Sequence, residues 1–142
     1  MTNQIEGIKM DELKEPAEVD RFVKTWCVDE IPFHVAMNEK MIENKVSLSA
    51  LMDKSRVNKN YGYNLINGRR TNPGRDKVLA MCIAAQLSYE ETQEMLMRAK
   101  VGGLYYRCER DVRIVASLNN KVGDVLAVNI ELEENGLQPL DV

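Results

Sequence analysis

Residues 47–86 contain three short helical patterns separated by tight turns. Ser47 precedes apolar residues at helical spacing, and its hydroxyl can accept a hydrogen bond from a free amide of the first turn. Asn58 can cap the next pattern in the same way, and Gly68 can take the left-handed conformation that closes a helix. The spacing predicts helices over residues 48–54, 59–67 and 74–86, with a turn at 55–57 between the first two.

Helical spacing recurs along the rest of the chain, whereas the alternation typical of strands never runs far. Pro16 and Pro32 mark helix starts, and Ser88 with Glu91 forms a capping box. Further helices are predicted over residues 16–27, 32–44, 89–99, 107–119 and 122–135. In the last of these, four apolar residues are expected to face the core: Val122, Val125, Leu126 and Ile130. We therefore expect an all-α protein built as a compact helical bundle.

Composition excludes several classes of protein. The 142 residues suffice for one buried core or two small units that share one, and 44% apolar content is ordinary for a globular protein. No apolar run approaches the roughly 18–20 residues of a membrane helix, and no secretory signal is visible, so a cytoplasmic protein is expected. The three cysteines are far apart and His34 is the sole histidine. We expect no metal, no cofactor and no enzymatic activity.

Positive charge is concentrated in one segment, although the net charge is −3. Residues 54–77 contain a single acidic residue, Asp76, and seven basic residues: Lys54, Arg56, Lys59, Arg69, Arg70, Arg75 and Lys77. Both flanks are acidic. Because screening confines surface fields to about 8–10 Å at physiological salt, a local basic face can attract phosphate on an acidic protein. A solvated surface loop is the alternative interpretation of the same cluster.

The predicted helix over residues 59–67 has two distinct faces. Val57, Leu65 and Ile66 can dock on the preceding helix. Gly62 indicates either close approach of the two helices or a point where the helix frays. The opposite face presents four polar residues: Lys59, Asn60, Tyr63 and Asn64. Asn can pair with adenine N6 and N7, Lys can donate to guanine O6 and N7, and a helix fits the major groove, which is about 12 Å wide. This face is therefore a candidate for contacting base edges.

Basic residues also surround the start of the helix predicted over residues 74–86. Arg69, Arg70 and Arg75 flank this N-terminus, where free amides and the helix dipole favour an anion. Guanidinium groups beside such a terminus can clamp a phosphate. Tyr61 is compatible both with a half-buried core position and with stacking or a phosphate contact.

Four segments together resemble a known family: SLSALMDKSRV, NKNYGYNLINGRR, NPGRDKVLAMCIAAQ and LSYEETQEML. They are similar to the second to fifth helices of the phage-repressor-like helix-turn-helix family, also called Cro/C1 or XRE, over residues 37–99. The resemblance implies a five-helix DNA-binding unit whose third helix contacts bases, here through Lys59, Asn60, Tyr63 and Asn64. It implies phosphate contacts from the following loop, here Asn67, Arg69, Arg70 and Arg75. A Gln that the family often has at the start of the second helix is replaced here by Ser47-Leu48-Ser49.

The resemblance also suggests a domain organisation and a function. Residues 1–15 are expected to be loosely ordered, and residues 16–100 to form a helix-turn-helix DNA-binding domain with an N-terminal helix. Residues 101–142 would form a two-helix extension, packed on the bundle or at a dimer surface. The predicted function is sequence-specific binding of double-stranded DNA by a bacterial or phage-type transcriptional regulator, as a homodimer on two half-sites. The alternative, favoured by the acidic net charge and the missing Gln, is a non-enzymatic adaptor that binds a protein partner and has lost DNA binding.

Overall fold

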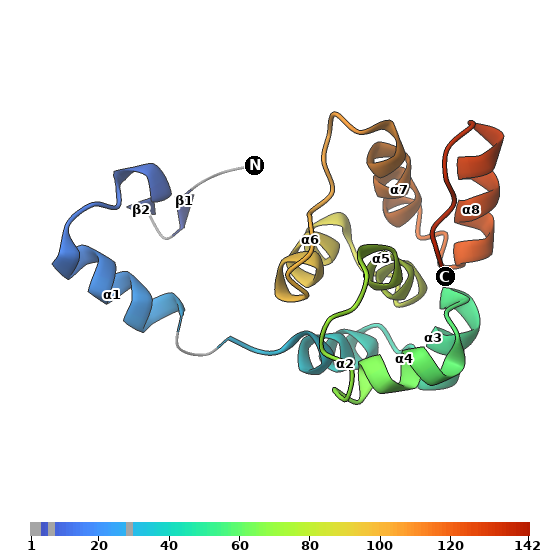
Figure 1. The fold of residues 1–142 in the computed structure, drawn as a ribbon, viewed down its shortest axis with the longest axis horizontal. Coiled ribbons are helices and arrows are strands. Elements are labelled where there is room, and N and C mark those ends of the chain that lie inside the picture. The colour runs from blue at the N-terminus through green and yellow to red at the C-terminus, as the bar shows by residue number, and fades with distance from the viewer. Residues whose placement is uncertain (1–3, 6–7, 28–29) are drawn as a thin grey trace. The chain divides into compact units, whose positions relative to one another are not determined.

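The computed structural model describes residues 4–5, 8–27 and 30–142, and the chain divides into two units, 1–31 and 32–142 (Figure 1). In the first unit, β1 (Gln4–Ile5) pairs antiparallel with β2 (Ile8–Lys9), and a 3-10 turn, η1 (Met10–Glu12), precedes α1 (Pro16–Trp26). The segment expected to be loosely ordered thus contains two paired strands of two residues each. Residues 1–3 and 6–7 of that segment lie outside the described residues.

Helix α1 begins at Pro16, as predicted, and carries its apolar side chains on one face. The rings of Phe22 and Trp26 lie 6.3 Å apart on that face, but no residue of the helix is buried. The sequence analysis placed this helix in the same domain as residues 32–100, whereas the contacts group it with residues 1–31. Periodicity finds an amphipathic helix, but it does not show which core, if any, the helix joins.

The second unit consists of α2 (Phe33–Glu43), α3 (Leu48–Ser55), α4 (Lys59–Ile66), α5 (Arg75–Ala84), α6 (Tyr89–Arg98), α7 (Glu109–Asn119) and α8 (Val125–Glu134). The predicted all-α class is confirmed, and every helix expected in this unit is present within a few residues of its expected bounds. The capping box forms in both directions, because Ser88 Oγ accepts from Glu91 N at 3.1 Å and Glu91 Oε1 accepts from Ser88 N at 2.9 Å. No helix in the described ranges is long and apolar enough to cross a bilayer.

Helix α5 forms the centre of this unit. All residues from Val78 to Ala85 are buried, and the helix packs against α3, α6 and α8 (Figure 1). Because α5 is apolar on all sides over these two turns, it can lie only in the interior of the bundle. Its polar first turn, Arg75 to Lys77, lies beside Tyr61 of α4 and Arg70 of the basic loop.

Helices α7 and α8 pack on each other and on α3, α5 and α6, so residues 101–142 belong to the bundle. In α8 the buried residues are Val125, Val128 and Leu132. The expectation that Val122, Leu126 and Ile130 face the core is wrong, since they are 39%, 49% and 50% exposed. Apolar residues surround most of this helix, so their spacing alone could not indicate which face is buried.

Candidate nucleic-acid interface

Helices α3 and α4 are joined by the tight turn that the sequence predicted. Ser47 Oγ accepts from Ala50 N at 3.1 Å, and Asn58 Oδ1 accepts from Tyr61 N at 3.2 Å, so both helices have side-chain caps. Arg56, the residue that follows the last residue of α3, has a left-handed backbone with φ of 62°. Val57 is 4% exposed between the two helices. The turn therefore fixes α4 at a defined angle to α3.

The inner face of α4 is held by two helices. A Cβ atom on Gly62 would lie 2.5 Å from Met52 Sδ, so only glycine permits the observed approach of α4 to α3 without a shift of that side chain. Leu65 and Ile66 are buried beside it. From α2, Asn38 Nδ2 donates to the Ile66 carbonyl at 3.0 Å. The apolar pattern of α4 predicted support from the preceding helix alone, whereas α2 provides a second support at the end of α4.

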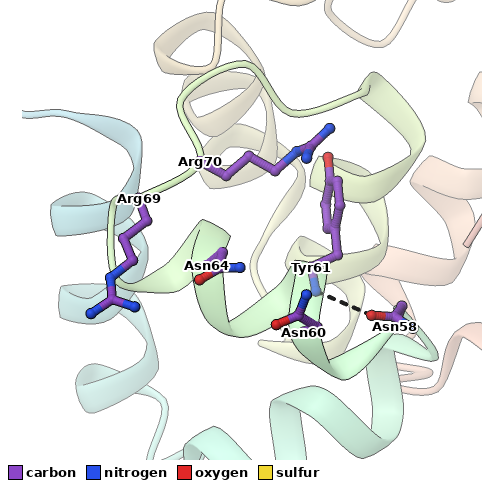
Figure 2. A pocket seen from close by; sticks show the side chains of 6 residues that line it. All are labelled: Asn58, Asn60, Tyr61, Asn64, Arg69 and Arg70. Atoms are coloured by element: carbon purple, nitrogen blue, oxygen red, sulfur yellow. Dashed lines mark hydrogen bonds between the residues drawn. The ribbon is translucent and has the colours of Figure 1, made fainter.

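All four candidates for base contact remain accessible on the outer face of α4. Lys59, Asn60 and Tyr63 are exposed, and Asn64 is half-buried. Lys59 and Tyr63 line a hollow of about 330 Å³ toward α3, together with Ser47, Ser49, Ala50, Met52 and Asp53. Asn60 and Asn64 line a second hollow of about 410 Å³ on the other side, with Asn58, Tyr61, Arg69 and Arg70 (Figure 2). The outer face of α4 thus forms a ridge between two open hollows.

The loop after α4 is shaped by local hydrogen bonds. Gly68 has φ of 83°, as expected for a residue that closes a helix. Asn67 Oδ1 accepts from Arg69 N at 3.0 Å, and Arg70 N donates to the Asn64 carbonyl at 2.9 Å. These bonds fix the start of the loop and direct the two arginine side chains apart. Arg70 points toward Tyr61 and Arg69 points away from it (Figure 2).

Arg75 does not join this group. Its Nη2 and Nη1 donate to the Asp111 carboxylate at 2.8 and 3.2 Å, and Asp111 is only 4% exposed. Its Nε and Nη2 also donate to the carbonyls of Gly102 and Gly103, at 2.8 and 2.9 Å. These four hydrogen bonds attach the connection between α6 and α7, and the first turn of α7 itself, to α5. We therefore remove Arg75 from the set of phosphate contacts that the sequence suggested.

Three more cations of residues 54–77 are also paired with carboxylates from the C-terminal region. Arg56 and Lys54 lie 3.0 and 3.7 Å from the Asp124 carboxylate, and the hydrogen bond from Arg56 is the main cause that lowers the pKa of Asp124. Lys77 Nζ donates to the main-chain carbonyl of Asp141 at 2.8 Å and lies 4.0 Å from the Asp141 carboxylate. We call Lys54, Arg56, Arg75 and Lys77 the paired cations.

The remaining cations, Lys59, Arg69 and Arg70, make no ion pair with any residue that the structure describes, and we call them the open cations. All three border the exposed face of α4. The cations of the segment that face no carboxylate among the described residues therefore all lie beside α4.

The structure also shows which contacts Tyr61 makes, a point that the sequence left open. Its hydroxyl accepts from Gly74 N at 3.2 Å, and the Arg70 guanidinium carbon lies 4.3 Å from the centre of its ring. Asn38, described above, is a second residue that the sequence analysis did not connect with α4. No local pattern indicates either contact, because both join segments separated by a helix end or a whole helix.

No protein-family model matches this chain. Comparison with curated proteins and with solved structures likewise found no match. The resemblance to the phage-repressor-like family stays a prediction from the four segments, and function is inferred from the geometry of α3, α4 and the loop that follows.

Proposed function

We propose that this chain is a sequence-specific DNA-binding protein, a transcriptional regulator of the phage-repressor-like type that inserts α4 into the major groove of double-stranded DNA. The observation that carries the proposal is the distribution of the open cations. Lys59, Arg69 and Arg70 all border the polar face of α4, while the paired cations of the same segment lie beside carboxylates of the C-terminal region. A base-contacting helix flanked by free positive charge is what a groove bordered by phosphates requires.

The side chains divide into two roles. Asn60 and Asn64 are one helical turn apart on the ridge, and their amides can pair with adenine N6 and N7. Lys59 and Tyr63 face the hollow toward α3 and can contact neighbouring bases. Arg69 and Arg70 point to different sides of the loop, which suits contact with separate phosphates (Figure 2). The side-chain nitrogen Nδ2 of Asn67 makes no hydrogen bond to a described residue and can donate to a phosphate, whereas Oδ1 and the backbone amide are used locally.

The first test is fluorescence anisotropy with a random-sequence duplex at low salt, followed by selection of bound sequences from a random pool. We expect non-specific binding in the micromolar range or tighter. On the selected site, Asn60→Ala and Asn64→Ala should each cost about 1–3 kcal/mol and relax the sequence preference. Asn119→Ala, a change to an exposed residue of α7, is the matched control. Unchanged affinity and preference in both α4 variants would overturn the assignment.

We place this regulator in the cytoplasm and propose that it acts as a homodimer. A single short helix contacts few base pairs, and two half-sites related by two-fold symmetry solve that problem. Analytical ultracentrifugation with and without the selected duplex checks the stoichiometry. One chain bound per site at saturating protein would remove the dimer from the proposal and leave the DNA contact in place.

A second candidate function is a protein-binding adaptor. The observation that favours it is the outer surface of α7 and α8, where Val112, Leu126 and Ile130 are 46–50% exposed. Carboxylates such as Glu133 and Glu134 share this surface with them, so it repels phosphate and suits a protein partner. An adaptor without DNA binding predicts no anisotropy change with duplex at micromolar protein, which is the opposite of the result expected above.

A further inference from the structure

Tyr61 occupies a central position between α4, the loop after it and the start of α5. Its own amide donates to Asn58 Oδ1, which anchors it in the first turn of α4. Its ring carries the Arg70 guanidinium, and its hydroxyl accepts from the amide of Gly74, the residue that caps α5. One side chain of α4 thus contacts both the arginine at the start of the loop and the backbone at its end.

The stacked pair also separates two hollows. On one side lies the hollow of about 410 Å³ that contains the candidate base contacts Asn60 and Asn64. On the other side lies a hollow of similar volume, about 410 Å³, which reaches Lys77 and Asp141 at the first turn of α5 and the end of the described chain. Tyr61 and Arg70 line both hollows, so the guanidinium is held at the border of the base-contacting face.

Stacking is a suitable way to hold an arginine that must bind phosphate. A guanidinium that lies over an aromatic ring uses the face of its plane, and its N–H groups remain free at the edge. An arginine held by a carboxylate, as Arg75 is by Asp111, has instead used those N–H groups. The Arg70 guanidinium is therefore held in position by Tyr61, while its N–H groups donate no hydrogen bond to any described residue. Bidentate phosphate binding needs both conditions.

From these contacts we infer that Tyr61 is a positioning residue that presents Arg70 to a phosphate of bound DNA. The ring sets the position of the guanidinium, and the hydroxyl fixes the end of the loop through Gly74. The inference rests on the proposed function and deepens it, because it assigns the phosphate contact of Arg70 to a side chain of the base-contacting helix. Base contact and phosphate contact would then be coupled through one residue of α4.

The test is a double-mutant cycle in the full chain, with Tyr61→Leu, Arg70→Ala and the double variant, read out as affinity for duplex DNA at several salt concentrations. Tyr61→Leu should weaken binding by about 2–5-fold when Arg70 is present, the range of an exposed cation–π contact. In the Arg70→Ala background it should have almost no further effect. Tyr61→Phe keeps the ring and should retain most of the affinity, which separates stacking from the hydroxyl contact.

The chain offers a matched control in a second cation–π pair. Arg107 lies 5.4 Å from the ring centre of Tyr106, on the connection between α6 and α7. Tyr106→Leu and Arg107→Ala remove the same chemistry away from α4 and should leave DNA affinity unchanged. Thermal unfolding of each variant shows whether a loss of affinity merely follows a loss of folded protein.

The outcomes distinguish this inference from the proposed function. If Arg70→Ala weakens binding but Tyr61→Leu weakens it equally with and without Arg70, or not at all, the positioning role is overturned and the DNA contact stands. If the wild-type chain binds no duplex at low salt, the proposed function and this inference both fail. A loss caused by Tyr61→Leu that Tyr61→Phe restores, and that vanishes without Arg70, supports the inference.

Discussion

Arg70 and Arg75 are five positions apart in the same basic segment, yet the fold gives them opposite environments. Arg75 makes four hydrogen bonds, two of them to a buried carboxylate, and is 28% exposed in its side chain. Arg70 is exposed, stacks on Tyr61 and has no carboxylate partner among the described residues. A cluster of positive charge in a sequence can therefore contain two kinds of cation. One kind pairs with carboxylates and stabilises the fold, and the other is available to a ligand.

The largest effect should come from breaking the Arg75 contact. Arg75→Met leaves the Asp111 carboxylate, 6% exposed in its side chain, without its cation, and this should cost about 3 kcal/mol of unfolding free energy. Urea denaturation measures the change. Arg70→Met, the same substitution at an open cation, should change stability by less than about 0.5 kcal/mol. Equal losses of unfolding free energy in the two variants would contradict the distinction between open and paired cations.

The reverse pattern is expected for DNA binding. Arg70→Ala should weaken duplex binding roughly tenfold, the equivalent of one charge-assisted hydrogen bond, and should flatten the salt dependence by about one unit. The measurement is anisotropy over a salt series with the selected and the random duplex. Lys100→Ala, an exposed cation beyond α6, should change neither quantity much. A variant that loses affinity only for the selected duplex would make Arg70 a base contact rather than a phosphate contact.

The stability of the bundle should depend on pH through the Asp76 carboxylate, which pairs with Arg110. Burial alone would raise the pKa of Asp76, but hydrogen bonds from Arg110 and from Asp141 N outweigh it and hold that pKa below its usual value. A lowered folded pKa contributes stability above the unfolded value of about 3.9, and this contribution is lost as pH falls through the folded pKa.

Asp76→Asn should therefore cost about 1 kcal/mol at pH 7, and the difference from wild type should disappear as the pH falls through the folded pKa of Asp76. Denaturant unfolding at a series of pH values is the measurement. Glu133→Gln, at an exposed position without an ion pair in the described structure, is the control and should follow the wild-type curve. A difference at Asp76 that persists unchanged into acid would show that the ion pair with Arg110 is not its source.

The smallest expected effect is a change in duplex affinity when a negative charge that shares a hollow with the open cation Arg70 is removed. The side chain of Asp141 is 92% exposed and lines the same hollow as Arg70. Its charge should repel a phosphate that approaches Arg70, so Asp141→Asn should tighten duplex binding by roughly twofold at low salt. Glu134→Gln makes the same charge change on α8 and controls for net charge. An equal gain in both variants would assign the effect to net charge rather than to the position of Asp141.

Local sequence chemistry predicted much of this fold and part of the candidate site. The caps at Ser47, Asn58 and Ser88 and the left-handed Gly68 involve partners within a few residues, so the sequence displays both members of each contact. The polar face of α4 follows from helical spacing for the same reason. Its buried glycine, Gly62, was correctly connected with close packing, although the sequence did not show that Met52 is what a Cβ would meet.

The spacing of apolar residues did not predict which helix face is buried where that depends on elements distant in the sequence. Leu126 and Ile130 were predicted to be buried and are about half exposed, because α8 is apolar on most sides and its neighbours decide which side is covered. The contacts group α1 with residues 1–31, and its amphipathic pattern could not show this, because such a pattern does not identify the element on which a helix packs. Tyr61 could be assigned only once Arg70 and Gly74 were known to lie beside it.

The sequence by itself determined the helices, their caps and turns, the polar ridge of α4 and the concentration of positive charge in residues 54–77, because each of these depends on neighbours along the chain. Tertiary structure decided which of those charges remain open. The partners of Arg75, Lys77 and Arg56 are Asp111, Asp141 and Asp124, which lie 36, 64 and 68 residues further along the chain. Such pairs exist only after α7, α8 and the chain end have packed onto α3 and α5, and what they leave uncovered is the face from which we infer DNA binding.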